Sequence, residues 1–375
     1  MKLDKILLFP YWAVLKLRDR RYKGGKRSKG AEVPTICVGN ITAGGTGKTP
    51  HTEMILRMLL QSDMWGMSNI AVLSRGYKRE SSGFQQVTRE GSSVMFGDEP
   101  LQIKKKFPGV TVAVDKNRIE GCDLLCHPEK MTGKRGRKCW NPHFPAADII
   151  VLDDAFQYRK LQADLNIVLV DYNRPLCKDH LIPIGRLRDL PERIEEADIV
   201  IATKCPAEMD NWSRTSFAYT LGMKDYSTST CEGVYPDGKK QILLFTTIQY
   251  EQSQPVYENS DPRYIYSKKL ILFTGIAKDT PLKNYLSDFY KIVKSFRFPD
   301  HHKYSWADFQ KIRSAMNSNP TAAIATTEKD AQRVLDFNGM PEEIRRRMFM
   351  IPIKVDFLTD FERDLFRDAI VNIHK

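Results

Sequence analysis

The chain has 375 residues, of which 42% are hydrophobic and 28% charged, and its formal net charge is +12. This composition is typical of a globular protein long enough for two domains, and it excludes a disordered or fibrous chain. Ten lysines and arginines but only two aspartates fall within residues 1–30, so most of the excess charge is terminal, which argues against a nucleic-acid-binding face.

The first element is a short apolar segment, residues 6–15, followed by a run of basic residues that ends at Lys29. Ten uncharged residues are too few to cross a bilayer, which takes about twenty, and the basic run opposes export as a signal sequence. We expect residues 1–30 to form an amphipathic helix in the membrane interface, with the basic side chains on anionic lipid. The alternative is a helix packed on the domain and followed by a solvated basic linker.

An apolar run at residues 33–38 leads into a glycine-rich stretch that ends at Pro50, and a helical pattern follows. Strand, glycine-rich turn and helix in this order predict a phosphate-binding loop. The Lys48 ammonium would reach the outer phosphates, and the Thr49 hydroxyl would bind Mg²⁺. The alternative is a glycine-rich turn with an incidental lysine. The residues expected to contact the nucleotide are Gly44, Gly45, Thr46, Gly47, Lys48 and Thr49.

Further apolar runs of strand length alternate with helical patterns, at residues 70–74, 110–114, 148–152, 166–170 and 198–202. Such continuous runs are typical of buried parallel strands, so we expect a doubly wound α/β sheet with ligands at the carboxyl ends of its strands. Asp153 and Asp154 directly follow one run, and a carboxylate beside a phosphate loop can hold Mg²⁺. We therefore expect both carboxylates at the metal, with turn formation as the alternative.

Other polar residues near the strand ends are ambiguous. Arg75 and Arg118 each follow a predicted strand, and either could bind a phosphate or pair with a surface carboxylate. Asp98 fits the N-cap of a helix with Pro100 in its first turn, and physical reasoning alone favours that capping role.

A cluster of cysteines and histidines raises the question of a zinc site. Its members are Cys122, Cys126, His127, Cys139 and His143. The segment between them is rich in lysine and arginine, and no pair has the tight spacing of a zinc finger. A basic surface loop with buried or idle cysteines is therefore favoured.

The second half of the chain predicts another α/β region. Residues 224–239 and 249–267 are expected as loops on either side of a strand at residues 242–246. Further strands are expected at residues 270–274, 292–296, 321–326 and 348–355, and a final helix at residues 360–373. We expect three parts: the interfacial segment 1–30, a phosphate-loop domain 31–210, joined by residues 356–375 if the final helix returns to it, and a smaller α/β domain 211–355.

Seven motifs together resemble one family, the tetraacyldisaccharide 4′-kinases, along nearly the whole chain. They are the glycine-rich loop of residues 39–50, Ser-Arg-Gly-Tyr of 74–77, Gly-Asp-Glu-Pro of 97–100, Asp-Asp-Ala-Phe-Gln-Tyr-Arg of 153–159, Phe-Thr-Gly-Ile-Ala of 273–277, Phe-Pro-Asp-His of 298–301 and Thr-Glu-Lys-Asp of 327–330. The resemblance implies two αβα domains with mainly parallel sheets, joined by a short β-ribbon, in a monotopic enzyme on the cytoplasmic face of the inner membrane. Two departures are Tyr158, where the family usually has histidine, and an insertion at residues 127–147.

The resemblance also implies a reaction. ATP, with Mg²⁺, would donate its γ-phosphate to the 4′-hydroxyl of a tetraacyldisaccharide 1-phosphate, a precursor of lipid A. Asp98 would accept the hydroxyl proton, His301 would orient Asp98, and Lys48 would neutralise charge on the transferred group. The acceptor is expected to contact Tyr77, Arg118 and Gln157.

We expect partners of only two kinds: the acylated lipid and an anionic membrane surface, with no nucleic acid and no required protein partner. The alternative function is a membrane-associated regulatory NTPase of the deviant phosphate-loop type, which has no lipid acceptor. That alternative gives no reason for the Gly-Asp-Glu-Pro and Phe-Pro-Asp-His motifs.

Overall fold

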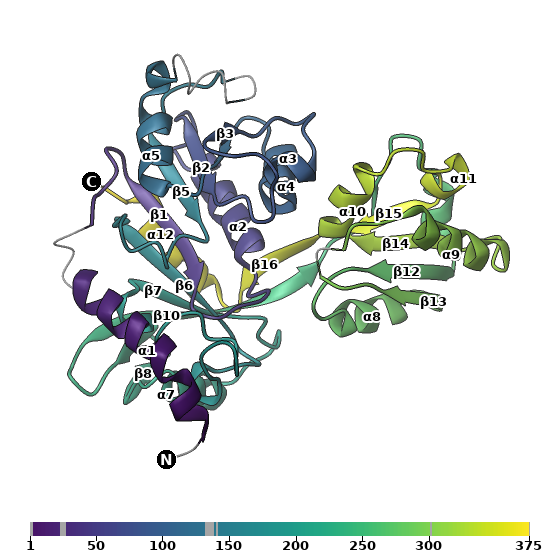
Figure 1. The fold of residues 1–375 in the computed structure, drawn as a ribbon. Coiled ribbons are helices and arrows are strands. Elements are labelled where there is room, and N and C mark those ends of the chain that lie inside the picture. The colour runs from purple at the N-terminus through teal and green to yellow at the C-terminus, as the bar shows by residue number, and fades with distance from the viewer. Residues whose placement is uncertain (1–2, 23–27, 132–138, 140–141, 301, 375) are drawn as a thin grey trace. The chain divides into compact units, whose positions relative to one another are not determined.

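The structure is a computed structural model, and it describes residues 3–22, 28–131, 139, 142–300 and 302–374 (Figure 1). The chain forms two compact units, each described here by itself. Unit 1 consists of Met1–Arg89, Ile103–Ile248 and Val355–Lys375, and unit 2 of Glu90–Gln102 and Gln249–Lys354.

Unit 1 is built on one mostly parallel sheet. Its strands are β1 (Thr35–Asn40), β2 (Ile70–Ser74), β3 (Gln85–Gln86), β4 (Thr111–Val114), β5 (Ile149–Asp153), β6 (Leu165–Asp171), β7 (Ile199–Thr203), β8 (Asp225–Ser227), β9 (Glu232–Val234), β10 (Lys240–Tyr250) and β16 (Ile353–Phe357). Their order is β3-β4-β2-β5-β1-β6-β7-β10-β9-β8, with β16 paired to β10. At the centre, β1 pairs in parallel with β5 and β6. The predicted parallel sheet is confirmed, because the expected apolar runs nearly coincide with β1, β2 and β4 to β7.

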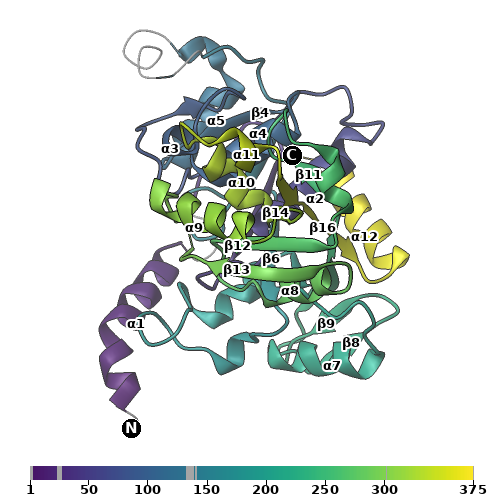
Figure 2. The ribbon, with the colours of Figure 1, turned by 90° about the vertical axis from the view of Figure 1, so that its right-hand side faces the viewer.

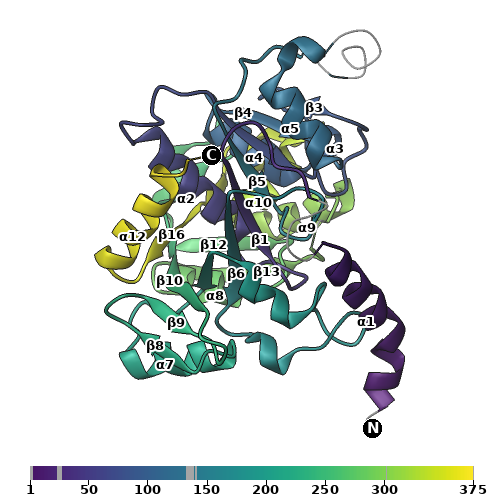
Figure 3. The ribbon, with the colours of Figure 1, turned by 90° about the vertical axis from the view of Figure 1, so that its left-hand side faces the viewer.

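Helices cover both faces of this sheet. They are α1 (Leu3–Tyr22), α2 (Lys48–Leu60), α5 (Arg118–Cys126), α7 (Asn211–Thr220) and α12 (Asp360–Val371), with 3₁₀ turns η1 (Pro128–Lys130), η2 (Leu176–Lys178) and η3 (Pro191–Glu196). Helix α4 (Asp98–Lys106) is divided, with its residues up to Gln102 in unit 2 and the others in unit 1. In Figure 3, α2 and α12 lie on one side of the central strands, and α1 and α5 lie on the other. Both faces of the strands are therefore dry, which explains why the runs are apolar without alternation.

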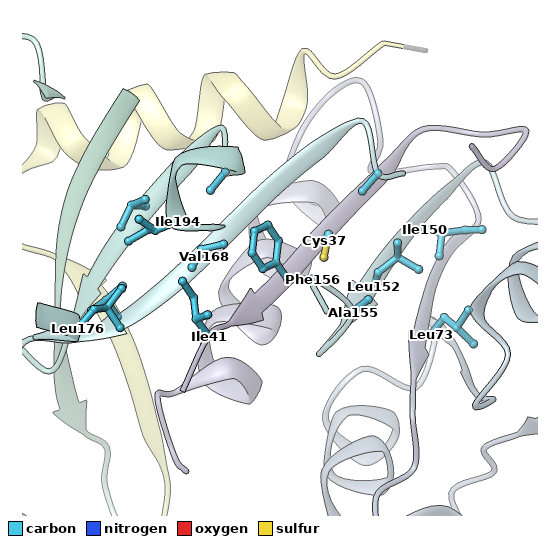
Figure 4. Packing of buried hydrophobic residues seen from close by; sticks show 14 of the residues in the cluster. Cys37, Ile41, Leu73, Ile150, Leu152, Ala155, Phe156, Val168, Leu176 and Ile194 are labelled. Atoms are coloured by element: carbon cyan, nitrogen blue, oxygen red, sulfur yellow. The ribbon is translucent and has the colours of Figure 1, made fainter. Parts of the chain in front are cut away.

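The core between the sheet and the α5 side is continuous. In Figure 4, Phe156 lies between Val168 and Cys37, with Ile194 beyond Val168 and Leu152 beyond Cys37; Phe156 and Ile194 come from the connecting segments. Gly39 of β1 lies so close to Phe156 that a Cβ at this position would be 2.4 Å from the Cβ of Phe156. The segment after β5 is thus pressed against β1, which holds the residues that follow β5 at the edge of the sheet.

Helix α1 packs along unit 1 through one face. Leu15 is 2% exposed and belongs to the core, and the Tyr11 hydroxyl donates to the carbonyl of Arg188 at 2.9 Å. Phe9 and Leu17, in contrast, are 61% and 65% exposed. Within the parts of the chain that are described, no helix has both the length and the apolar character needed to cross a membrane.

The region after β7 differs from the expected loops. Residues 225–227 and 232–234 form an antiparallel hairpin, β8 and β9, which extends the sheet through β10. Because β10 also pairs in parallel with β7, residues up to 248 pack with unit 1, whereas we expected a boundary near residue 210. The paired strands β10 and β16 both pass from one unit to the other, which is the expected β-ribbon. Helix α12 contacts α2 and lies in unit 1.

Unit 2 is a smaller α/β layer structure. Its strands are β11 (Gln254–Pro255), β12 (Lys269–Thr274), β13 (Lys291–Arg297), β14 (Ala323–Thr327) and β15 (Met348–Ile351), and its helices are α3 (Ser93–Phe96), η4 (Pro262–Tyr266), α8 (Thr280–Ser287), α9 (Trp306–Asn317), α10 (Glu328–Leu335) and α11 (Glu342–Arg345). The order is β11-β15-β14-β12-β13, and all pairs but β11–β15 are parallel. In Figure 2, α8 lies on one side of β12 and β13, and α9 and α10 lie on the other.

Candidate nucleotide-binding and phosphoryl-transfer site

The predicted phosphate loop connects β1 to α2. Gly44 and Gly47 have φ of 113° and 89°, the left-handed conformation that favours glycine, and Gly45 does not. Thr46 is 3% exposed, and its hydroxyl oxygen accepts from the Asn40 amide at 2.8 Å. The loop therefore ends on Gly47, the N-cap of α2, where backbone N–H groups and the helix dipole favour an anion.

Lys48, the first residue of α2, lies in a small group of charged side chains. Its ammonium is 3.6 Å from Oδ1 of Asp154 and donates to Oδ1 of Asn40 at 3.5 Å. Arg188 also donates to both, at 3.1 Å to Asp154. Burial on its own would raise the pKa of Asp154, but Lys48 and Arg188 together lower it. Two cations around one carboxylate leave a net positive charge beside the loop.

The first carboxylate of the pair is placed differently. Asp153 ends β5, is 1% exposed, and accepts hydrogen bonds from the hydroxyls of Ser74 at 3.1 Å and Thr52 at 3.5 Å. Asp154 follows with φ of 51°, and its N–H donates to the carbonyl of Val38 in β1 at 2.9 Å. Asp153 and Asp154 thus contact different partners at the end of one strand.

These residues fit a magnesium ion by the chemistry of their donors. Thr49 is in the first turn of α2 and is 9% exposed. Its hydroxyl and the carboxylates of Asp153 and Asp154 are oxygen donors of the kind that Mg²⁺ prefers. All three come from the same edge of the unit 1 sheet.

Two further side chains contact backbone carbonyls of the loop. The Lys204 ammonium donates to the carbonyl of Gly45 and to Asp171 at 2.7 Å. The His51 ring is 1% exposed, with Nδ1 at 2.7 Å from the carbonyl of Gly47. Burial lowers the pKa of His51 to about 4, although its hydrogen bond to Gly47 opposes the shift. The ring is therefore neutral at pH 7, and Nδ1 carries its proton because a carbonyl can only accept.

Asp98 begins α4 and is 7% exposed. We expected it in the first domain, but the structure groups residues 90–102 with unit 2. The side chains at the start of α4 contact α10. Oδ2 of Asp98 accepts from Nε of Arg333 at 3.0 Å and from its Nη2 at 2.5 Å, and Glu99 accepts from Lys329 at 2.8 Å.

The structure makes Asp98 the first residue of α4, one position after the predicted N-cap. The carboxylate stands in the first turn of α4, where its charge complements the helix dipole, and Oδ1 accepts from the N–H of Glu99 at 3.1 Å. Its predicted partner His301 lies outside the described residues. The preceding Asp300 has a carboxylate oxygen 3.9 Å from Nη2 of Arg333.

The residues expected to bind the acceptor lie in dissimilar environments. Tyr77 is 58% exposed, and the Gln157 amide donates to the carbonyl of Asn40 at 2.8 Å. Arg118 is 2% exposed, and its guanidinium donates to the backbone carbonyls of Asp115 and Asp153, the latter at 2.9 Å. In this structure the buried Arg118 guanidinium is bonded to the backbone at the end of β5. Its predicted contact with the acceptor would need this side chain to move. The Tyr158 hydroxyl donates to Asn117 at 3.0 Å.

The cysteines and histidines of the insertion do not gather around a metal in the described residues. There, the group with suitable spacing is Glu32, Asp123 and His127, which is partly exposed and contains no cysteine. Cys122 and Cys139 are buried, and burial raises the pKa of both thiols. The buried state of these two cysteines agrees with the expected alternative to a zinc site.

Sequence reasoning missed several residues of this region. Arg188, His51 and Arg333 were not singled out, because each acts through a contact with a residue remote in sequence. The sequence offered only weak signals for such contacts. Asn40, a partner of Arg188, stands inside the glycine-rich motif, and Arg333 is one helical turn after Asp330 of another motif.

Comparisons with known proteins give the family. The sequence profile of the family described as "Tetraacyldisaccharide-1-P 4'-kinase" matches residues 4–370. A tetraacyldisaccharide 4′-kinase of Phocaeicola vulgatus is 36% identical over 364 residues, which cover 95% of this chain and 90% of that protein. One of Parabacteroides distasonis is 37% identical over 368 residues, covering 96% and 88%.

The fold has a counterpart among solved structures. A crystal structure of LpxK from Aquifex aeolicus, described as an "apo" form in complex with ATP, aligns with a TM-score of 0.68 over 98% of this chain and 99% of that one, at 23% identity. This likeness supports the α/β architecture. The profile match over nearly the whole chain and the curated relatives above 30% identity show that the chain belongs to the tetraacyldisaccharide-1-phosphate 4′-kinase family.

Proposed function

We propose that this protein transfers the γ-phosphate of ATP to the 4′-hydroxyl of a tetraacyldisaccharide 1-phosphate. The observation that carries the proposal is the group around the loop of unit 1, in which Lys48, the first residue of α2, and Arg188 both contact Asp154. That arrangement suits a nucleoside triphosphate, because the loop N–H groups, the helix dipole and two cations all attract phosphate. The acceptor follows from the names of the relatives.

On the donor side, Lys48 and the loop backbone hold the outer phosphates. Thr49, Asp153 and Asp154 would hold Mg²⁺, which when bound neutralises charge on the β- and γ-phosphates. Asp154 is shared with Arg188, so the nucleotide competes with a carboxylate for these cations. His51 and Lys204 keep the carbonyls of Gly47 and Gly45 turned away from the phosphates.

On the acceptor side, Asp98 accepts the proton of the 4′-hydroxyl. The hydroxyl O–H bond breaks, its oxygen bonds to the γ-phosphorus, and the bond from that phosphorus to the bridging oxygen breaks, which releases ADP. Because the transition state is loose, the carboxylate mainly orients the hydroxyl and takes its proton late. His301 is the partner that we propose for Asp98 in this step.

The enzyme acts peripherally at the cytoplasmic face of the inner membrane, where its lipid acceptor lies. The support is the outer face of α1, on which Phe9, Trp12 and Leu17 are exposed beside the basic Arg20 and Arg21. Apolar side chains would enter the interface, and the cations would meet anionic headgroups.

The test is transfer of label from [γ-³²P]ATP to an acylated disaccharide 1-phosphate in detergent micelles. Labelled lipid with the wild-type protein, and none with Lys48→Ala, is the expected result. Release of labelled inorganic phosphate without labelled lipid would point to the regulatory NTPase instead. An Asp98→Ala variant should still bind ATP while losing transfer, and transfer at the wild-type rate would remove Asp98 from the mechanism.

A further inference from the structure

The Arg333 guanidinium of unit 2 contacts Asp98, the carboxylate that we propose as the proton acceptor for the lipid hydroxyl. Nε and Nη2 of Arg333 both donate to Oδ2 of Asp98, at 3.0 and 2.5 Å. The two side chains are 8% and 7% exposed. Two donors on one oxygen fix the direction of the Asp98 side chain more strongly than a single hydrogen bond would.

Arg333 is itself held rigidly. Its remaining terminal nitrogen, Nη1, donates to the carbonyl of Gly275 at 3.1 Å and to Oδ1 of Asp330 at 2.9 Å. Oδ2 of Asp330 accepts from the N–H of Gly275 at 2.9 Å and from the Thr327 hydroxyl at 2.7 Å. The guanidinium therefore has one orientation, set by the end of β12 and the start of α10.

Close packing leaves little room for adjustment at Gly275. A Cβ there would be 2.8 Å from Oδ1 of Asp330 and 3.2 Å from the hydroxyl of Tyr304. Gly275 of the Phe-Thr-Gly-Ile-Ala motif and Asp330 of the Thr-Glu-Lys-Asp motif therefore both hold the Arg333 guanidinium in place.

Arg333 lies among several carboxylates. Arg333 faces Asp98 and Asp330, and Asp300 is 3.9 Å away. Burial on its own would lower the pKa of Arg333, but Asp98 and Asp330 raise it. The neighbouring Lys329 is paired with Glu99 at 2.8 Å. Two cations thus face four carboxylates, and each cation directly contacts a carboxylate, as buried charges require.

We propose that Arg333 is a positioning residue for phosphoryl transfer, which fixes Oδ2 of Asp98 and keeps this carboxylate ionised and aimed at the acceptor hydroxyl. The inference rests on the proposed function, in which Asp98 accepts the hydroxyl proton. A cation next to the base weakens its basicity, but a loose transition state requires little basicity and much orientation. Asp98 is therefore a weaker base beside Arg333, but its carboxylate is better aligned.

The experiment compares the pH dependence of kcat/KM for the wild type, Arg333→Met and Arg333→Lys in the labelled-lipid assay. Without its cation, the buried carboxylate binds a proton more readily, so in Arg333→Met the acid limb should move up by about one pH unit or more, with kcat lowered about a hundredfold. KM for ATP should stay unchanged. Arg333→Lys retains the charge but not the paired donors, so its acid limb should stay in place while kcat falls about tenfold.

The control is Arg313→Met. Arg313 also forms an ion pair in unit 2, with Glu343, but both side chains are nearly half exposed, and we expect unchanged kinetics. Each pH profile is normalised to its own maximum, so partial unfolding of a variant lowers its amplitude without moving its acid limb. Superimposable profiles of Arg333→Met and the wild type would overturn the proposal and leave Arg333 a structural residue. Absence of lipid phosphorylation by the wild type would instead refute the proposed function.

Discussion

His51 and Thr246 are joined by a hydrogen bond of 3.0 Å across 195 residues of sequence, which ties the first turn of α2 to β10. Since Nδ1 of His51 donates to the carbonyl of Gly47, the bare Nε2 accepts from the Thr246 hydroxyl. Both hydrogen bonds require a neutral ring with its proton on Nδ1. A protonated ring could not accept from Thr246. The phosphate loop thus depends on a buried histidine that is not itself at the phosphates.

Acid should therefore destabilise unit 1 through His51. In the unfolded chain a histidine binds a proton below about pH 6.5, whereas folded His51 resists protonation until about pH 4. Stability is complete above pH 6.5 and is lost as the pH falls through this window, by roughly 2 kcal/mol at pH 5. Urea unfolding at several pH values measures the effect. His51→Gln should flatten the pH dependence, and the exposed His180→Gln should not; equal slopes for His51→Gln and the wild type would contradict the prediction.

Gly39→Ala should destabilise unit 1 by overpacking. The added Cβ would meet the Cβ of Phe156 at 2.4 Å and its backbone nitrogen at 3.1 Å, so the segment after β5 would have to move. We expect a loss of roughly 2 kcal/mol and weaker ATP binding, because Asp154 begins that segment and Asp153 directly precedes it. Thermal unfolding and nucleotide titration check both. Gly30→Ala is the matched control, since no atom lies within 4 Å of its added Cβ. A Gly39→Ala protein as stable as this control would refute the predicted overpacking against Phe156.

Removing the charges at the loop should abolish turnover without unfolding the protein. Lys48→Ala deletes a cation that contacts Asp154, and Asp153→Asn removes a proposed metal ligand. Each should lower kcat by about a thousandfold or more, through lost stabilisation of charge in the transition state. Lipid-transfer kinetics with circular dichroism as the fold check would measure this. A folded Lys48→Ala protein with near-normal turnover would exclude the phosphate-loop assignment.

The exposed face of α1 should control membrane binding. Deleting the helix would also remove buried Leu15 and the contact of Arg18 with Asp189 at 3.3 Å, so substitution is the cleaner test. The triple change Phe9→Ser, Trp12→Ser and Leu17→Ser should reduce co-sedimentation with anionic vesicles and raise KM for the lipid more than KM for ATP.

Two controls sharpen the vesicle experiment. Trp212 is 77% exposed on α7, and Trp212→Ser should leave vesicle binding unchanged. Added salt should weaken binding of the wild type, because attraction between basic residues and a lipid surface is screened. If the triple variant sediments as the wild type does, the outer face of α1 has no role at the membrane.

The sequence by itself determined the parallel strands and the phosphate loop. Runs such as residues 70–74 are apolar without alternation because both faces of the strand are covered, and a local pattern can show that. The loop was equally visible, since glycine, lysine and threonine at fixed spacing between a strand and a helix have few other uses.

Only the tertiary structure decided which side chains complete these local elements. Arg333 reaches Asp98 across 235 residues, and residues 90–102 group with unit 2. Arg188 joins Lys48 at Asp154, and the hairpin of β8 and β9 extends a sheet where polar composition predicted loops. The physical reason is the same in each case. An ion pair or a short edge strand depends on its partner in space, and a partner far away in sequence leaves no trace in the local pattern.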